Sequence, residues 1–195
     1  MGDFLHRLTD AVLRSEFLPV FLRMKIMRMV GFRICPDVTI WPGASFRSKN
    51  FQIGHNVFIN VGFFFDGCAE LVIEDNVRIG QYVRVITGTH EIGSVDQRGS
   101  VDVVARSVRI ERGSWIGAGA ILLPGVTIGA GCVIGAGSIV THATDPSGIY
   151  LGNPARRVRD LADESDSRRD GPAGDPAIVQ QLRRRNEKGA DQWSR

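Results

Sequence analysis

Large aliphatic residues recur at every sixth position through the second half of the chain. The series is Ile110, Ile116, Leu122, Ile128, Ile134 and Val140. Four residues after each of the first five stands a small or β-branched residue, namely Ser114, Ala120, Val126, Cys132 and Ser138. Helices repeat at about 3.6 residues and ordinary strands at about two, so neither explains this spacing. The series predicts a coil of three flat faces with one aliphatic pointing inward per face, which is a parallel β-helix.

Two shorter series continue the same spacing in other frames. They are Ile53, Ile59, Phe65 and Ile73, Ile79, Val85. The step from Phe65 to Ile73 is eight residues instead of six, so we expect a bulge around Asp66 and Gly67. The step from Val85 to Ile110 is twenty-five residues, one more than four faces. We interpret residues about 88–105 as an excursion loop, and long loops on a regular scaffold are often functional.

The N-terminal part follows a helical pattern. Leu5, Leu8 and Val12 form one stripe, and Val20, Met24 and Met27 form a second after Pro19. We expect residues 1–37 to be a helical segment that packs on the coil of residues 38–159. The basic residues Arg23, Lys25, Arg28 and Arg33 leave an alternative open, in which this segment makes peripheral contact with a membrane or another anionic partner.

The C-terminal part, residues 160–195, is polar and carries many charges of both signs. We therefore expect a disordered tail, with room for a short helix after Pro176.

Composition narrows the class of protein. The chain has 195 residues, a net charge of +3 and a pI near 9.0, and it contains no recognisable nucleic-acid-binding motif. Three widely spaced cysteines (Cys35, Cys68 and Cys132) favour reduced thiols and a cytoplasmic location. The N-terminus lacks the pattern of a signal peptide, and no apolar run reaches the roughly 20 residues of a membrane helix.

Several stretches resemble a known enzyme family. They are NVFINVGFFFDGC, IEDNVRIGQYVRVITGTHEIG, GSWIGAGAILLPGVTIGAGCVIGAGSIV and GNPARRVR, which together cover roughly residues 38–159. This part of the chain resembles the hexapeptide-repeat acyltransferases, most of all the galactoside and maltose O-acetyltransferase group. The resemblance implies an all-β solenoid with a left-handed coil, assembly as a homotrimer, and acetyl-CoA or another acyl-CoA as co-substrate in a cleft between neighbouring subunits. It implies no bound cofactor.

The resemblance assigns the reacting and acceptor-binding residues. His90 matches the family's catalytic histidine, at the head of the excursion loop. Asn60 matches an asparagine that faces the acceptor, and Asp66 falls in the acidic acceptor patch. Phe64 and Glu91 are expected to complete the acceptor pocket. From the residues alone, Asn60 and Asp66 could equally be corner and turn residues.

The resemblance also places the CoA. Trp115 matches an aromatic that lines the cleft, and Ala118 matches the position whose backbone N–H faces the thioester oxygen. Ala136, Thr141, Arg156 and Arg157 are expected to contact CoA as well. Trp115 precedes the inward Ile116, so we expect its indole to point outward, where it can cover a ligand. The alternative for the arginines is simple solvation.

Some positions depart from the family pattern. Gly62 stands where relatives often carry a second asparagine, Phe63–Phe65 replaces smaller residues, and Thr141-His142 replaces a Thr-Lys pair. These departures put the acceptor in doubt. The loss of an amide beside gained aromatics favours a glycoside with an apolar aglycone or acyl group over a free sugar.

The chemistry needs no metal and no covalent intermediate. A histidine, with an ordinary pKa near 6.5, suits a general base that acts on a hydroxyl at neutral pH. His55, His90 and His142 are far apart in sequence, which argues against a zinc site. Cys132 stands at a small-residue position of the repeat, so we expect it to be a core residue. We expect a CoA-dependent O-acetyltransferase acting on a sugar or glycoside. A longer acyl chain, an amine acceptor, or a non-catalytic structural coil are the alternatives.

Overall fold

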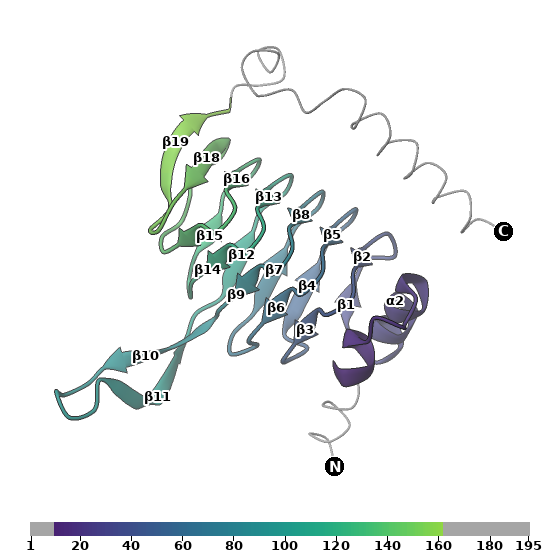
Figure 1. Cartoon of the computed structure of the whole chain (residues 1–195), viewed down its shortest axis with the longest axis horizontal. Helices are drawn as coiled ribbons and strands as arrows, with labels where there is room; N and C mark the ends of the chain where they lie inside the picture. The colour runs from purple at the N-terminus through teal and green to yellow at the C-terminus, as the bar shows by residue number, and fades with distance from the viewer. Residues whose placement is uncertain (1–9, 162–195) are drawn as a thin grey trace. The chain divides into compact units, whose positions relative to one another are not determined.

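The computed structural model describes residues 10–161, and the predicted parallel β-helix is confirmed (Figure 1). Three parallel sheets form the faces of the coil. Face A contains β1 (Arg33–Ile34), β4 (Phe51–Ile53), β7 (Leu71–Ile73), β12 (Val108–Ile110) and β15 (Thr127–Ile128). Face B contains β2 (Thr39–Ile40), β5 (Phe58–Ile59), β8 (Arg78–Ile79), β13 (Trp115–Ile116), β16 (Val133–Ile134) and β18 (Gly148–Leu151). Face C contains β3 (Ser45–Phe46), β6 (Phe64–Phe65), β9 (Arg84–Val85), β14 (Ile121–Leu122) and β17 (Ile139–Val140).

The six-residue series become three vertical ladders inside the coil. Each inward residue stands in register with the one in the next turn, as Ile110 does with Ile73 and Ile128 on face A. On face B the ladder runs through Ile59, Ile79, Ile116 and Ile134. These side chains are at most 1% exposed, and burial of each aliphatic contributes about 1.5–3 kcal/mol. The ladders therefore make the coil a rigid scaffold.

The two ends of the coil are closed by different devices. Helix α2 (Val20–Met29) covers the first turn with the buried Met24 and Met27, and Phe32 stacks on Phe51 just below it. At the other end β19 (Arg156–Asp160) pairs antiparallel with β18. The coil begins at Arg33, so its first strand lies within the residues 1–37 that the sequence assigns to a helical segment.

One member of the basic stripe in α2 points inward. The Arg23 side chain is 1% exposed, and its guanidinium donates hydrogen bonds only to backbone carbonyls. The acceptors are Leu13 (2.8 Å), Ile40 (3.2 Å), Ser15 (2.7 Å) and Leu18 (2.9 Å). Arg23 thus fastens α2 and the chain before it to the first turn, and it is not available to an anionic partner.

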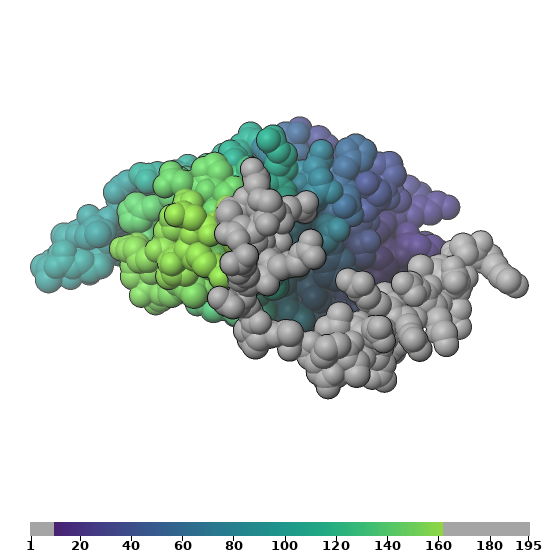
Figure 2. Space-filling view, turned by 90° about the horizontal axis from the view of Figure 1, so that it is seen from above, coloured from purple at the N-terminus to yellow at the C-terminus, as the bar shows by residue number. Residues whose placement is uncertain are grey.

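The excursion after Val85 is a β-hairpin that projects from the coil (Figures 1 and 2). Strand β10 (Gly88–Ile92) pairs antiparallel with β11 (Gly99–Ala105), with Gly88 opposite Ala105 and His90 opposite Val103. The hairpin leaves the corner between faces C and A, called the C/A corner below. The corner between faces B and C is called the B/C corner.

Some expectations fall outside the described residues. They concern the stripe at Leu5 and Leu8 and the tail after Leu161, including the short helix after Pro176. Among the described residues, no helix is long and apolar enough to cross a membrane.

Candidate active site

His90 lies on the projecting hairpin and is exposed. Its Nδ1 is 3.3 Å from the carbonyl oxygen of Asp102 on the opposite strand. A carbonyl oxygen can only accept, so this contact favours the tautomer with the proton on Nδ1. The other ring nitrogen, Nε2, then carries a free lone pair. The hairpin thus presents the imidazole in the form that a general base needs.

Asp66 holds the base of the hairpin. Its carboxylate accepts hydrogen bonds from the backbone N–H groups of Thr87 and Gly88, both at 2.9 Å, from that of Cys68 at 3.4 Å, and from the Thr87 hydroxyl. Partial burial raises the pKa of Asp66, but these hydrogen bonds outweigh it and hold the pKa below its ordinary value. Asp66 is therefore an ionised anchor that binds the hairpin at Gly88, two residues before His90. Its carboxylate oxygens are already hydrogen-bonded within the chain.

Two other side chains lie at this corner. Glu91 is exposed at the irregular step of the hairpin between His90 and Ile92. Cys68 is exposed beside the Asp66 carboxylate, and partial burial and that charge raise the pKa of its thiol. A raised pKa disfavours the thiolate, so Cys68 is a poor nucleophile. Cys132 is fully buried, which confirms its prediction as a core residue.

The B/C corner brings together residues from successive turns. Asn60 directly follows β5 at this corner, in register with Gly117 and Gly135 of later turns. Ala118 and Ala136 each stand one position further along, and the N–H of Gly137 donates to the Ala118 carbonyl (2.8 Å). Within residues 10–161, neither the Ala118 nor the Ala136 N–H donates a hydrogen bond. A Cβ on Gly80 would lie 2.7 Å from the Ala118 nitrogen, so only glycine leaves that N–H uncrowded. The Ala118 N–H is thus free to bind an oxyanion.

Aromatic side chains flank this corner on both faces. Trp115 points outward from face B and is 58% exposed, as its phase in the repeat predicts. Phe64 points outward from face C and is half-buried. The neighbouring Phe63 is fully buried and packs on Phe46, so it cannot face a ligand. The Phe63 side chain points inward from the corner directly before β6.

The remaining predicted CoA contacts lie elsewhere in the coil. Thr141 directly follows β17 at the C/A corner, where its hydroxyl is 2.8 Å from Nδ1 of His142. Arg156 is exposed and hydrogen-bonds only the neighbouring Ala155 carbonyl. Arg157 is bound within the chain, to the Asp160 carboxylate, the Tyr150 hydroxyl and nearby carbonyls. Of the two arginines, Arg156 has the guanidinium that is more open to a phosphate.

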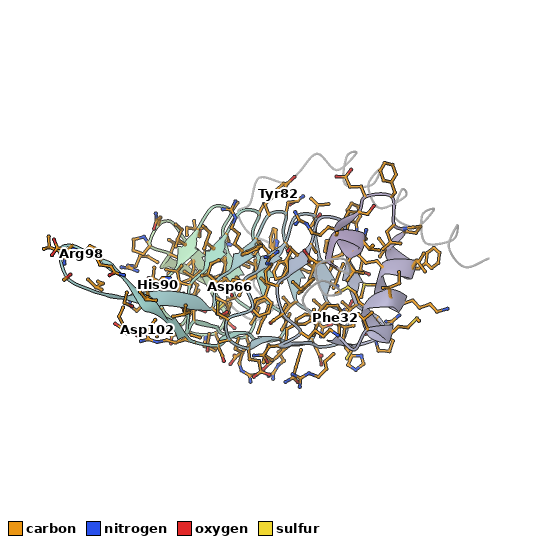
Figure 3. The ribbon with its side chains drawn as sticks, turned by 90° about the horizontal axis from the view of Figure 1, so that it is seen from below. Phe32, Asp66, Tyr82, His90, Arg98 and Asp102 are labelled. Carbon is orange, nitrogen blue, oxygen red and sulfur yellow. The ribbon has the colours of Figure 1, made fainter. Side chains whose placement is uncertain are left out.

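His90 and the B/C corner are far apart within one chain. Tyr82 occupies the B/C corner one turn before Ala118, and five residue steps of face C lead from it to Thr87 at the C/A corner. At about 3.3 Å per residue these steps span about 16 Å. Figure 3 shows Tyr82 on a different side of the coil from His90 and Asp102. The two predicted halves of the site do not meet in a single copy.

Tyr82 is a feature that the six-residue series does not single out. It is 63% exposed and has a φ of +56°. Left-handed backbone is costly for a bulky residue, by about 1–3 kcal/mol, and tends to persist where function needs it. The sequence marks Tyr82 in one way, since an aromatic residue stands there at a corner position that otherwise favours glycine.

Among the described residues, no three His, Cys, Asp or Glu side chains are grouped to hold a metal ion. His55 pairs instead with Asp37, with 3.2 Å between Nδ1 and the carboxylate, at the corner between faces A and B.

Comparison with known proteins agrees with this architecture. The family described as bacterial transferase hexapeptide (six repeats) matches residues 107–142. Nodulation protein L of Rhizobium meliloti is 38% identical over 124 residues, which cover 60% of this chain and 67% of that protein. Across the curated relatives that it matches, the chain spans 55% to 67% of their length.

Solved structures extend the likeness to most of the coil. A galactoside acetyltransferase in complex with coenzyme A is 27% identical with a TM-score of 0.74, covering 83% of this chain and 81% of that one. A hexapeptide-repeat acetyltransferase of Vibrio cholerae, complexed with acetyl coenzyme A, is 28% identical with a TM-score of 0.67, covering 83% and 87%. One of these neighbours was thus solved with coenzyme A and the other with acetyl coenzyme A.

Proposed function

The chain belongs to the hexapeptide-repeat acetyltransferases, and from that premise we propose that it transfers an acetyl group from acetyl-CoA to a hydroxyl of a sugar or glycoside. The CoA-bound neighbours support acetyl-CoA as the donor. The observation that carries the proposal is the free Nε2 of His90. His90 lies on a hairpin that Asp66 anchors and that projects from the coil (Figure 2).

The reaction needs one proton acceptor and one oxyanion donor. Nε2 of His90 removes the proton from the acceptor hydroxyl as its oxygen attacks the thioester carbonyl carbon. The tetrahedral oxyanion receives a hydrogen bond from the Ala118 N–H, a contribution of about 3 kcal/mol in comparable sites. The carbon–sulfur bond then breaks, and the imidazolium returns its proton to the CoA thiolate. The acetyl group moves once, with no covalent enzyme intermediate.

The site is completed by a second copy. His90 and Ala118 belong to different corners of one chain, so the hairpin of one copy has to meet the B/C corner of the next. Two surfaces suit such contacts. Outward residues on faces B and C are mostly apolar: Phe58, Trp115, Val133 and Ile149 on face B, and Phe64, Ile121 and Ile139 on face C.

Face A carries polar side chains instead, including the pair of Arg109 with Glu74 at 2.7 Å. Two different apolar faces on one subunit suit heterologous contacts, which form a closed ring when the rotation between subunits closes. We take the ring to be a trimer, which is the assembly that the sequence resemblance implies.

A thiol-release assay tests the function. The protein is incubated with acetyl-CoA and a panel of hexoses, their alkyl or aryl glycosides, and amino sugars. We expect CoA release that depends on a hydroxyl acceptor, with an acetyl ester in the product. Release with amino sugars alone, or only with longer acyl-CoA donors, would instead favour the N-acyl or long-chain alternative. No acceptor-dependent release with any donor would contradict the proposal.

A further inference from the structure

Tyr82 stands where the other turns have glycine. At the B/C corner the backbone N–H of Tyr82 donates to the Val61 carbonyl of the previous turn (2.9 Å). The N–H groups of Gly62, Gly119 and Gly137 make the same bond to the turns before them. The equivalent positions in the other turns are Gly43, Gly62, Gly119 and Gly137, all with positive φ. Glycine adopts this backbone without strain and tyrosine does not. Tyr82 is therefore retained against the backbone preference of its own position.

The ring of Tyr82 lies over Gly62 in the preceding turn. A Cβ on Gly62 would be 2.4 Å from Cδ1 and 2.6 Å from Cε1 of the ring, so a side chain at residue 62 would displace the ring. The ring occupies the volume that an amide at that position would fill. Because Tyr82 is nevertheless 63% exposed, a large part of the ring faces outward. The result is an exposed aromatic surface over Gly62.

This surface lies beside the proposed thioester position. Gln81, next to Tyr82, accepts a hydrogen bond from the N–H of Gly119 (2.7 Å), which places Ala118 and Gly119 one turn above Tyr82. Asn60 and Gly62 lie one turn below it. Few side-chain polar atoms in the turn below Tyr82 are free to bind a ligand. Gly62 has no side chain, and Oδ1 of Asn60 already accepts from the Val61 N–H (2.8 Å).

The height of Tyr82 along the coil matches that of the hairpin. The hairpin leaves the coil directly after β9, in the same turn that contains Tyr82, and returns in the turn that contains Ala118. Copies related by rotation about an axis along the coil keep their turns level. In such an assembly the hairpin of a neighbouring copy meets this corner at the level of Tyr82 and Ala118. With the thioester at the Ala118 N–H, as proposed above, the Tyr82 side is left for the acceptor.

We propose that Tyr82 determines acceptor specificity by stacking against an apolar ring face of the acceptor, so that aryl or alkyl glycosides react better than small polyols or free hexoses. This inference rests on the proposed function. An aromatic face gains from covering apolar surface and offers no hydrogen bond to replace those that a free polyol makes with water. Tyr82 is a specificity residue and takes no part in proton transfer.

The test compares kcat/KM for an aryl glycoside with that for its free hexose, in the wild-type protein and in three variants. We expect a wild-type preference of about tenfold or more for the glycoside, and its loss in Tyr82→Gly. Glycine suits the left-handed backbone, so this variant is expected to fold, and its KM for acetyl-CoA is expected to stay unchanged. Tyr82→Phe keeps the ring and is expected to keep the preference. Phe17→Ala removes an aromatic that is 97% exposed, far from this corner, as the matched control.

The outcomes separate this inference from the proposed function. An active wild-type protein without the preference, or a Tyr82→Gly variant that keeps it, overturns the role of Tyr82 and leaves the acetyltransferase proposal intact. A Tyr82→Phe variant that loses the preference overturns stacking in favour of the hydroxyl. A wild-type protein with no acceptor-dependent CoA release overturns the proposed function itself.

Discussion

The carboxylate of Asp66 accepts hydrogen bonds from the backbone N–H groups of both Thr87 and Gly88, which begin the hairpin that carries His90. Asp66 follows β6 and Thr87 follows β9, one turn later, so stacking of successive turns brings the two together. The anchor joins a rigid coil to a two-stranded hairpin that has no other strand beside it. It explains how a histidine on a projecting element keeps a defined position.

Replacing Asp66 with Asn tests the anchor. The amide offers one acceptor where the carboxylate offers two, so an N–H group at the hairpin base loses its partner, at about 1–3 kcal/mol. We expect reduced stability, and turnover lower by up to about 10²-fold because His90 shifts relative to its substrates. Circular-dichroism melts and the CoA-release assay measure the two effects. Asp96→Asn, an exposed residue at the hairpin tip, is the control and is expected to change neither.

The same anchor predicts an acid-side pH dependence of stability. The pKa of Asp66 in the folded protein lies below its ordinary value near 3.9, so its contribution is complete above about pH 4 and is lost as the pH falls through the lower folded value. Urea unfolding between pH 7 and about pH 2 is expected to show a steeper acid-side loss in wild type than in Asp66→Asn. Parallel curves for the two proteins would exclude Asp66 as the titrating anchor.

Replacing His90 with Ala tests the general base. Such bases contribute about 10²–10⁴ in rate, so we expect turnover to fall by that factor while the melting temperature and assembly stay unchanged. His90 is exposed and makes one side-chain hydrogen bond, so its loss leaves no buried group unpaired. His55→Ala, which removes another exposed histidine, is expected to keep wild-type turnover. Equal turnover in the wild type and His90→Ala would remove the assignment.

Replacing Arg23 with Met separates the scaffold from the site. The change removes the guanidinium donor from the carbonyl oxygens of Leu13, Ser15, Leu18 and Ile40. The contacts to Leu13 and Ile40 are buried, and a buried acceptor left unsatisfied costs about 1–3 kcal/mol. We expect a much lower melting temperature, with kcat unchanged at a temperature where the variant is folded. Lys25→Met on the exposed side of α2 is the control and should melt like the wild type. An unaltered melting curve for Arg23→Met would show that the inward guanidinium does not hold α2.

The core was accessible from sequence and the site only in part, for physical reasons. Inward residues such as Ile110 and Ile128 repeat with the geometry of the coil, so their period gives the fold directly. The hydrogen bonds of Asp66 are different, because they depend on which residues of successive turns face each other at a widened corner. Tyr82 escapes the pattern altogether, because its φ and its position over Gly62 appear only when the turns stack.

The central claim is that one copy supplies His90 and the next supplies the CoA-binding corner. Co-expression of differently tagged His90→Ala and Ala136→Trp chains tests it. Ala136 is exposed at the B/C corner, so a tryptophan there obstructs the CoA surface without entering the core. Each variant alone is expected to be nearly inactive. Chains that carry Ala118→Trp and Ala136→Trp damage the same corner, and their mixture is the matched control.

In mixed oligomers purified through both tags, CoA release is the deciding measurement. In a trimer that contains both variants, one of the three interfaces joins an intact histidine to an intact CoA surface. The account therefore predicts recovery to about a third of the wild-type rate, with no recovery in the control mixture. Confirmed mixed oligomers that remain as inactive as either parent would place both halves of the site in one chain and contradict the account.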